Sequence, residues 1–303
     1  MDLSIIIVSY NTKQLLKKCI DLLSLNTHDL TYEVIIVDNG STDGSVKYLR
    51  GLASSSKFKI ILNSENVGFA RANNQGLKIF HGKFVLLLNS DTEIHSNVLG
   101  EMIDWMTKNP TVGIASCNLL NKNRTVQGTG GYFPTIIRVI SWMTIQDLPY
   151  VDNFIKPFHP LKPRSITRNN AFYQNQKELD WVTGAFFLIR KKVIDEIGFL
   201  DTDYFMYTEE VDYCYRAKSK GWQVVFLPKW QIIHLGGASG STGYPIIAEF
   251  KGVKLFYKKH YPGWQYPILR LFLKLGALIR MVIFGILDGK ESAKTYAKAF
   301  IEA

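Results

Sequence analysis

Continuous apolar runs of strand length alternate with segments of helical periodicity in the first third of the chain. The runs contain no alternating polar positions, which is typical of strands buried on both faces of a parallel sheet. They span residues 3–8, 32–37, 58–62 and 84–88, and predicted helices follow from Thr12, Val46 and Phe69. Strands that alternate with helices at this spacing form βαβ units, so we predict an α/β fold with a doubly wound, mostly parallel sheet.

Each of these strands ends in a polar or glycine-rich turn. The turns cover residues 9–11, 38–45, 63–68 and 89–91. In open α/β sheets ligands bind at the carboxyl ends of the strands, so this edge is expected to hold the site. The first turn contains neither G-x-G-x-x-G nor a P-loop sequence, which argues against a dinucleotide-dependent enzyme and against a P-loop protein.

The second half of the chain is less regular. A strand is predicted at 112–116, and the pattern then dissolves between residues 118 and 176, where five prolines interrupt it. Such a stretch is either a functional loop or lid, or an insertion without a specific role. Strands return at 179–190, 224–226 and 232–233, with helices at 191–197 and from Thr208, which is the expected N-cap.

The last 60 residues have a different pattern. A lysine-rich helix is predicted from Tyr244 to His260, and residues 268–287 are almost continuously apolar. At 100° per residue, the three basic residues of that run, Arg270, Lys274 and Arg280, fall on one face. The pattern fits a helix lying in a membrane interface, or one packed on the rest of the protein or on a second subunit.

Composition and charge narrow the class of protein. The 303 residues are 47% hydrophobic and 20% charged, with a net charge of +10 that favours a polyanionic neighbour. No recognised nucleic-acid-binding motif accompanies this charge, so nucleotide phosphates or anionic lipid are preferred over nucleic acid. The three cysteines are far apart, and Asp2 stands where a signal peptide would be basic. We therefore expect a cytoplasmic protein with reduced thiols.

Two acidic stretches and one histidine are candidates for chemistry. Asp91 at a strand end suits Mg²⁺ or Mn²⁺, although it would equally be a solvated residue before a helix. Glu209, Glu210 and Asp212 occupy a first helical turn, where they either serve the macrodipole or supply a general base. His234 follows a strand and precedes a Gly-Gly turn, so it is either a structural residue or a ligand of metal or phosphate.

Taken together and in order, these stretches resemble the inverting glycosyltransferase family two, which has the GT-A fold. Bacterial rhamnosyl- and galactofuranosyl-type transferases are the most similar members. The resemblance extends from about residue 3 to 240, and no single run is specific alone. The matching runs are residues 4–11, 34–45, 66–76, 86–91, 183–191, 199–216 and 233–239.

The resemblance implies a role for each matching position. Glu210 would be the catalytic base, one methylene longer than the usual Asp, and Glu209 would bind the acceptor hydroxyl. Asp91 and His234 would hold Mn²⁺ or Mg²⁺, and Asn89 replaces the first Asp of the family's Asp-x-Asp motif, which weakens the case for strict metal dependence. The donor or its sugar would contact Ser9, Tyr10, Asn11, Asp38, Asn66, Arg71, Asn89, Ser90, Asp91, Trp181 and Gly184.

The resemblance also implies an organisation and a reaction. Residues 1–243 would form the GT-A domain, with a nucleotide-sugar-binding half at 1–117 and an acceptor-binding half at 118–243. Residues 244–303 lie beyond the resemblance; their own pattern predicts amphipathic helices that associate with the inner face of the cytoplasmic membrane or form a homodimer. The reaction would transfer rhamnose from dTDP-rhamnose to a saccharide or lipid-linked saccharide during bacterial cell-surface polysaccharide synthesis.

Three alternatives stay open at this point. In the first alternative, the donor is a UDP-sugar rather than dTDP-rhamnose. A sugar-phosphate nucleotidyltransferase is disfavoured because the turn after the first strand is not glycine-rich. A catalytically silent nucleotide-sugar-binding protein at a membrane surface is compatible with Asn89, but the joint presence of Asp91, Glu210 and His234 argues against it.

Overall fold

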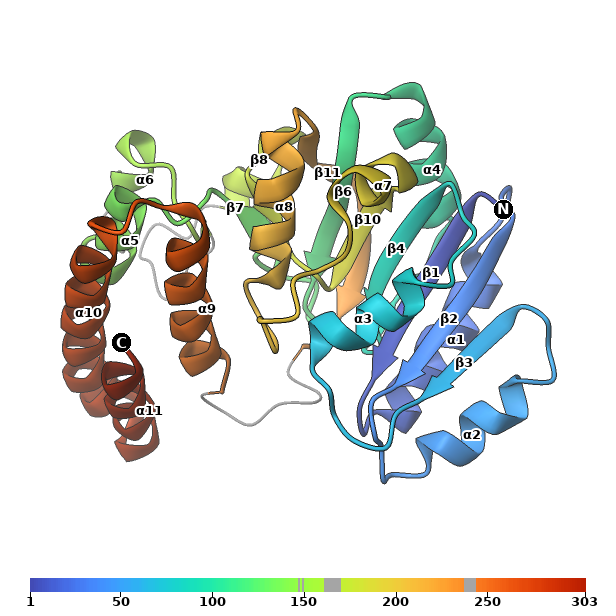
Figure 1. The fold of residues 1–303 in the computed structure, drawn as a ribbon, viewed down its shortest axis with the longest axis horizontal. Coiled ribbons are helices and arrows are strands. Elements are labelled where there is room, and N and C mark those ends of the chain that lie inside the picture. Colours follow the sequence, from blue (N-terminus) through green and yellow to red (C-terminus); the bar gives the residue numbers. More distant parts are fainter. Residues whose placement is uncertain (147, 149, 161–169, 237–243) are drawn as a thin grey trace.

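A computed structural model describes residues 1–146, 148, 150–160, 170–236 and 244–303, arranged around one mixed β-sheet (Figure 1). Its strand order is β3-β2-β1-β4-β10-β6-β11-β5, and β8 pairs with β11 off this path. The pairs β3-β2, β2-β1, β1-β4 and β6-β11 are parallel. The strands are β1 (Leu3–Ser9), β2 (Tyr32–Asp38), β3 (Phe58–Leu62), β4 (Phe84–Asn89), β5 (Thr92–Glu93), β6 (Val112–Leu120), β8 (Lys177–Leu179), β10 (Phe186–Arg190) and β11 (Gln223–His234).

Helices cover both faces of this sheet. Alternate residues of one strand face opposite sides, so Ile5 and Ile7 pack with Leu16 of α1 and Met102 of α4, whereas Ile6 joins the cluster of α3 and α8. The predicted doubly wound α/β architecture is therefore confirmed. The helices before residue 220 are α1 (Lys13–Asn26), α2 (Ser45–Leu52), α3 (Phe69–Leu77), α4 (Val98–Lys108), α5 (Ile136–Thr144), α6 (Val151–Phe154), α7 (Lys191–Ile197) and α8 (Glu209–Ser219), with a 3₁₀ turn at Asn170–Tyr173.

The structure corrects the prediction for the second half of the chain. Residues 179–190 are not one strand, because the chain leaves the main sheet at β9 (Trp181–Val182) to pair with β7 (Gly130–Gly131) before returning as β10. The pieces 224–226 and 232–233 are one strand, β11, with an irregular register between Leu227 and Gln231. The stretch 118–176 includes an apolar helix, α5, which its flanking prolines had obscured, while residues 147, 149 and 161–169 lie outside the described residues.

Three helices follow the sheet: α9 (Tyr244–His260), α10 (Gln265–Asp288) and α11 (Lys290–Glu302). The first two are as predicted and the third is additional. Figure 1 shows α9 between α8 and α10, with α10 and α11 at the end of the molecule opposite α2. No helix among the described residues is both long and apolar enough to cross a membrane.

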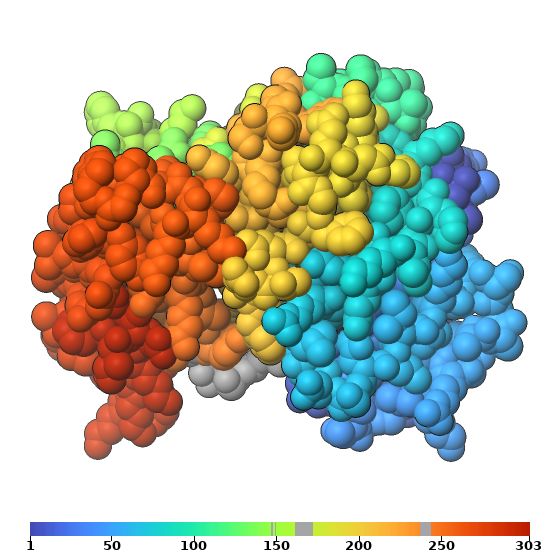
Figure 2. Space-filling view, viewed as in Figure 1, coloured from blue at the N-terminus to red at the C-terminus, as the bar shows by residue number. Residues whose placement is uncertain are grey.

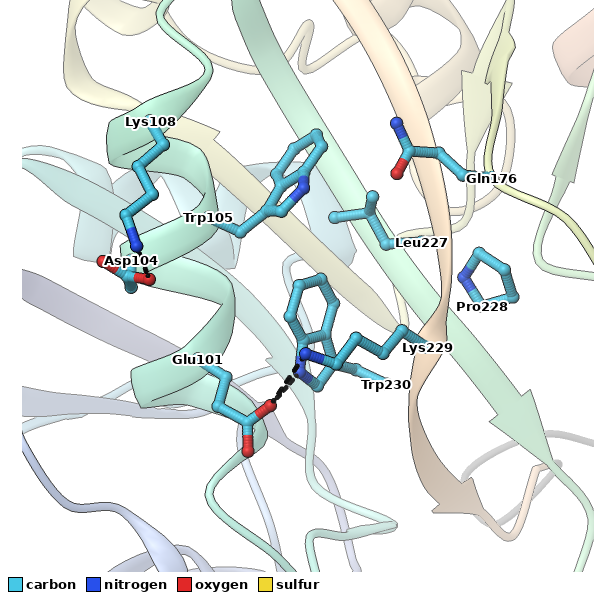
Figure 3. A pocket seen from close by; sticks show the side chains of 9 residues that line it. All are labelled: Glu101, Asp104, Trp105, Lys108, Gln176, Leu227, Pro228, Lys229 and Trp230. Carbon is cyan, nitrogen blue, oxygen red and sulfur yellow. Dashed lines mark hydrogen bonds and ion pairs between the residues drawn. The ribbon is translucent and has the colours of Figure 1, made fainter.

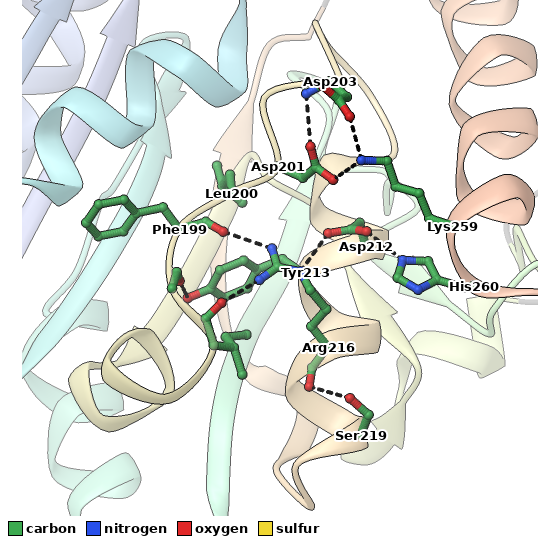
Figure 4. Close-up of polar contacts among 12 residues, drawn as sticks. Phe199, Leu200, Asp201, Asp203, Asp212, Tyr213, Arg216, Ser219, Lys259 and His260 are labelled. Carbon is green, nitrogen blue, oxygen red and sulfur yellow. Dashed lines mark hydrogen bonds and ion pairs between the residues drawn. The ribbon is translucent and has the colours of Figure 1, made fainter.

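Polar contacts attach α9 to α8 (Figure 4). His260 Nε2 lies 2.7 Å from Asp212 Oδ1, and Arg216 Nε donates to Asp212 Oδ2 at 2.8 Å. Lys259 Nζ donates to both Asp201 and Asp203, at 2.5 and 2.6 Å. The side chain of Asp212, expected only to serve the macrodipole or catalysis, thus joins the two helices.

The basic residues of α10 do not point as predicted. Arg270 Nε donates to the Ala303 carbonyl at 2.9 Å, Lys274 lies over the Phe300 ring, and Arg280 donates to backbone carbonyls at the end of α5. They therefore bind neighbouring helices within the protein. The reason is that carbonyls at the ends of α5 and α11 lack helical partners and attract cations.

Candidate active site

The turns after β1 and β2 form one polar network at the sheet edge. Asp38 is fully buried at the end of β2; its Oδ1 accepts from the Ser41 amide at 2.9 Å, and its Oδ2 has no partner among the described residues. Asn11, with φ of 53°, donates its amide to Ser41 Oγ at 2.9 Å and accepts from the Thr42 amide at 2.7 Å. The side chain of Asn11 thus fixes the loop, and Asp38 keeps one oxygen for a ligand.

A chain of hydroxyl groups connects this edge to β4. Ser9 Oγ lies 3.0 Å from Thr12 Oγ1, which lies 2.9 Å from Ser90 Oγ. All three residues are buried, and Tyr10, between them, is partly exposed. The predicted residues Ser9 and Ser90 therefore position the two turns against each other.

Asp91 and His234, far apart in the sequence, meet at the edge of the sheet. Their strands are held together by the pairing of β5 with β11, in which Thr92 is opposite His234. His234 Nε2 lies 3.3 Å from Asp91 Oδ1 and 3.2 Å from Asn89 Nδ2. Asp91 is 7% exposed. The structure thus brings together the predicted metal ligands and the Asn that replaces the family's first Asp.

Gln127, which the sequence did not single out, determines the tautomer of His234. Its Nε2 donates to the His234 carbonyl at 2.7 Å and to Asn121 Oδ1 at 2.8 Å, which fixes the orientation of its amide group. Its Oε1 then faces His234 Nδ1 at 2.8 Å. Because an amide oxygen can only accept, Nδ1 carries a hydrogen, and Nε2 is the ring atom that faces Asp91 and Asn89.

This donor set fits a hard divalent cation. Metal-binding histidines usually donate their second ring N–H to a fixed acceptor, which is the role of Gln127. Asp91 would supply a carboxylate oxygen and His234 its Nε2, and the side chain of Asn89 lies beside them, with Nδ2 3.2 Å from His234 Nε2. No group of three or more His, Cys, Asp or Glu residues with metal-binding spacing occurs in the described ranges. Mg²⁺ and Mn²⁺ sites of this kind are completed by water and by phosphate oxygens of the substrate.

The start of α3 contacts the loop that leads to α8. The amide of Phe69 donates to the Phe205 carbonyl at 2.7 Å, and a Cβ on Gly68 would lie 2.6 Å from that oxygen. Gly184 adjoins the Phe69 ring and shares its loop with Ala185, whose carbonyl accepts from the Asn89 amide at 3.0 Å. These contacts join the end of β4 to the approach of α8.

Two residues of this region that are predicted to contact the sugar donor differ in their surroundings. Asn66 Oδ1 accepts from Asn39 Nδ2 at 2.8 Å and from the Gly68 amide at 3.0 Å, so it is engaged in holding the turn before α3. Arg71 lies one turn into α3 and is exposed. Asn66 is thus committed to the fold, whereas Arg71 is accessible to an anion.

Glu209 and Glu210 begin α8, after two residues in a strained conformation. Tyr207 and Thr208 have φ of 69° and 73°, a region unfavourable for a β-branched residue. Thr208 occupies the N-cap position, but its side chain makes no capping hydrogen bond, which corrects the prediction. The turn directs both carboxyl groups inward, where one oxygen of each has no partner among the described residues.

The surroundings of these two carboxyl groups raise their pKa values. Burial, followed by the charge of Glu210, raises the pKa of Glu209 well above its ordinary range. For Glu210, burial raises the pKa to about 7, the charge of Glu249 acts in the same direction, and His159 opposes it. Glu249 of α9 and His159 form an ion pair. A carboxyl group that ionises near pH 7 is suited to act as a general base.

Trp181, which is predicted to lie against a sugar, belongs to β9, and this strand packs against α8. Trp181 is 6% exposed, and its ring packs edge-on against the His159 ring with centroids 5.4 Å apart. Its Nε1 has no partner among the described residues. Trp181 therefore belongs to a largely buried aromatic cluster with Phe158 and His159.

Two surface cavities have different relations to these residues. One, of about 310 Å³, lies between α4 and β11 around Trp105 and Trp230, and its charged side chains pair locally (Figure 3). Trp230 Nε1 donates to Glu101 at 2.7 Å there. The other, of about 240 Å³, is lined by Tyr207, Tyr244 and the loop 203–206. Its lining includes Tyr207, two residues before Glu209, so it is the better candidate for an acceptor path.

The sequence of this chain is similar to those of known glycosyltransferases. The model of the family described as "Glycosyl transferase family 2" matches residues 4–216. An N-acetylglucosaminyl-diphospho-decaprenol L-rhamnosyltransferase of Mycobacterium tuberculosis is 22% identical over 294 residues, covering 92% of this chain and 91% of the relative. The low-salt glycan biosynthesis hexosyltransferase Agl10 of Haloferax volcanii is 24% identical, covering 95% and 91%.

Solved structures support the fold. The mannosyltransferase PcManGT of Pyrobaculum calidifontis, in complex with GDP-Man and Mn²⁺, superposes with a TM-score of 0.58 at 15% identity, covering 99% of this chain and 85% of that one. GalNAc-T7 with UDP, GalNAc and Mn²⁺ gives a TM-score of 0.64 at 16% identity, covering 98% and 56%. The expectation of a GT-A fold is thereby confirmed.

Proposed function

This chain belongs to glycosyl transferase family 2, and we propose that it transfers a sugar from a nucleotide-sugar to a saccharide or lipid-linked saccharide with inversion of configuration. The observation that carries this proposal is Glu210: a carboxyl group with a pKa near 7, one oxygen of which has no partner among the described residues, at the start of a helix whose preceding loop lines a cavity. That is the group an inverting transfer requires, since a single base must remove the proton from the attacking hydroxyl.

The residues of the chain act at two ends of the reaction. At the acceptor end, Glu210 takes the proton of the hydroxyl whose oxygen forms a bond to the anomeric carbon. The bond from that carbon to the diphosphate breaks, and its electron pair leaves with the phosphate oxygen. Glu209, kept protonated by burial, would donate a hydrogen bond to the acceptor. Trp181 Nε1, which has no partner among the described residues, would be a second donor to a sugar.

At the donor end, Asp38 would accept a hydrogen bond from the base or ribose through its free oxygen. Tyr10 and Arg71 are accessible to the nucleotide, and Ser9, Asn11, Asn66 and Ser90 hold the turns around it. Asp91, His234 and the Asn89 amide oxygen would hold Mn²⁺ or Mg²⁺, which when bound offsets the negative charge on the departing diphosphate. The Gly184 turn keeps the space beside Asn89 open.

We further propose dTDP-rhamnose as the donor, with a UDP-sugar as the second candidate. The proposal is supported by the 22% identical rhamnosyltransferase, which covers nearly the whole chain. A lipid-linked acceptor and a role in cell-surface polysaccharide synthesis follow from the same relative. Three buried cysteines with pKa values raised by burial favour a reducing compartment such as the cytoplasm.

Calorimetric titration with nucleoside diphosphates tests the donor site. dTDP, UDP and GDP are titrated with and without Mn²⁺ into the wild type, Asp91→Ala and, as a matched control, the exposed carboxylate variant Asp104→Ala. We expect one nucleotide to bind only with Mn²⁺, and only to the wild type and the control. Product analysis with dTDP-rhamnose and a polyprenyl-diphospho-N-acetylglucosamine acceptor then determines the anomer. No nucleotide binding in the presence of metal would favour a catalytically silent protein.

A further inference from the structure

The outer side of α10 is apolar and is not covered by the protein. Every exposed residue between Leu271 and Leu287 is Leu, Ile or Val, and Leu271, Val282 and Ile286 are 55%, 55% and 79% exposed. At 1.5 Å per residue, the stretch from Leu271 to Ile286 is roughly 22 Å long. Its exposed area is on the order of 700 Å², more than monomeric soluble proteins usually leave contiguous.

The opposite side of the same helix packs against the rest of the protein. Leu269, Leu273 and Ala277 are buried, and Gly276 approaches Met143 of α5 so closely that a Cβ there would lie 2.5 Å from its sulfur. Arg270 and Arg280 bind backbone carbonyls on this side. The apolar residues therefore face outward because the packing of α5, α9 and α11 fixes the rotation of α10.

The C-terminal helices carry most of the net positive charge of the chain. Residues 244–303 contain ten Lys and Arg against four Asp and Glu, so this fifth of the chain carries +6 of the net +10. The exposed lysines of α11, Lys290, Lys294 and Lys298, lie one turn apart. Trp264, 64% exposed, immediately precedes α10. Tryptophan is the side chain most typical of the interface between membrane and water.

We propose that the outer face of α10, with the lysines of α11, docks on the surface of a bilayer that contains anionic lipid. An apolar helix face flanked by lysines is how helices lie in the headgroup region, and each added basic residue strengthens binding to anionic lipid. A second copy of this chain is the less favourable occupant, because a symmetric dimer through α10 would bring together two helical units that each carry +6. Figure 2 shows this unit, in orange and red, forming one end of the molecule.

Vesicle sedimentation tests this surface with the full chain. The protein is mixed with phosphatidylcholine vesicles that contain about 30% phosphatidylglycerol, and separately with pure phosphatidylcholine. The triple variant Leu271→Gln/Val282→Gln/Ile286→Gln changes only exposed side chains. The matched control, Leu25→Gln/Leu62→Gln/Ile79→Gln, changes exposed apolar residues of the first half that are 67%, 40% and 38% exposed.

We expect the wild type and the control to bind anionic vesicles, and the α10 variant to bind at least about tenfold more weakly. Lys290→Gln/Lys294→Gln/Lys298→Gln should reduce binding to anionic vesicles only, and salt at about 0.5 M should have the same effect. Circular dichroism is used to check that each variant is folded. The assay contains no donor or acceptor, so it stands or fails independently of the proposed transferase reaction.

Three results would overturn the proposal: no binding of the wild type to either vesicle, equal binding of the α10 variant, or equal binding of the lysine variant. Light scattering during gel filtration identifies the other occupant. A wild-type dimer that the α10 variant converts to a monomer, without vesicle binding by either, would assign the face to a second copy of the chain.

Discussion

Gly252 of α9 makes the most demanding contact between the C-terminal helices and the start of α8. A Cβ at this position would lie 2.2 Å from Thr208 Oγ1, 2.6 Å from Thr208 Cβ and 3.2 Å from the Tyr207 carbonyl. Thr208 has little freedom to move, because it and Tyr207 are already in the left-handed region. We therefore expect Gly252→Ala to displace α9 from the turn that holds Glu209 and Glu210.

The expected magnitude follows from overpacking. Inserting a methyl group into a close-packed contact costs about 1–3 kcal/mol, which corresponds to a fall in melting temperature of roughly 2–6 °C for a domain of this size. Because Glu210 follows the displaced turn directly, kcat should fall as well. The measurements are thermal unfolding by circular dichroism and initial rates of nucleoside diphosphate release.

A matched control and a rescue variant make the result specific. Gly263→Ala adds the same methyl group where nothing lies within 4 Å, and should leave both stability and kcat unchanged. Thr208→Gly removes the side chain that clashes and relieves the left-handed strain, so Gly252→Ala/Thr208→Gly should recover most of the lost stability. If Gly252→Ala melts and turns over like Gly263→Ala, α9 does not hold the catalytic turn, and the reasoning is refuted.

Four further predictions concern the two ends of the site. Glu210→Gln should reduce kcat by about 10²–10⁴ and leave calorimetric nucleotide affinity unchanged. The pKa of Glu210 is raised to about 7, so the native state keeps a proton that the unfolded chain releases above pH 4.5, and the free energy of unfolding falls as pH rises through this window. Glu210→Gln should therefore raise the free energy of urea unfolding at pH 8 by on the order of 2 kcal/mol. No gain would contradict the assigned burial. For the wild type, kcat/KM should rise with pH up to about 7 and then level off, whereas a flat profile would exclude Glu210 as the base. Gln127→Leu should weaken Mn²⁺ binding in the presence of nucleotide about 10–100-fold, measured by calorimetry, and unchanged affinity would mean that Gln127 does not orient His234.

Local sequence signals were sufficient for elements whose pattern is not interrupted. β3 spans the predicted residues 58–62, and α7 spans 191–197 as predicted. These elements have uninterrupted apolar periodicity and clear glycine or polar ends. Where tertiary pairing decides, the sequence was insufficient: residues 181–182 are as apolar as residues 186–190, and only the presence of β7 explains why they leave the main sheet.

The sequence indicated only those residues of the candidate site that have a local signal. Asp91, Glu210 and His234 stand out because acidic or imidazole groups follow apolar strands or begin a helix. Gln127 carried no such signal, since it lies in an irregular stretch and acts through its distance from His234. Glu249 and Gly252 were also missed, because their effect on α8 depends on the packing of α9. The division at residue 243 into catalytic and C-terminal parts stays a prediction.

The antiparallel pairing of β4 with β10 has a consequence for biosynthesis. Leu88 pairs with Phe186, so the nascent chain exposes the edge of β4 until almost 100 further residues have been translated. At typical elongation rates this takes roughly 5–20 s. During that interval the apolar edge of β4 can pair with other chains. A ribosome that stalls, or a message that is truncated, before residue 186 would therefore release an aggregation-prone fragment. Correct folding of this protein thus depends on uninterrupted translation of the segment from β4 to β10.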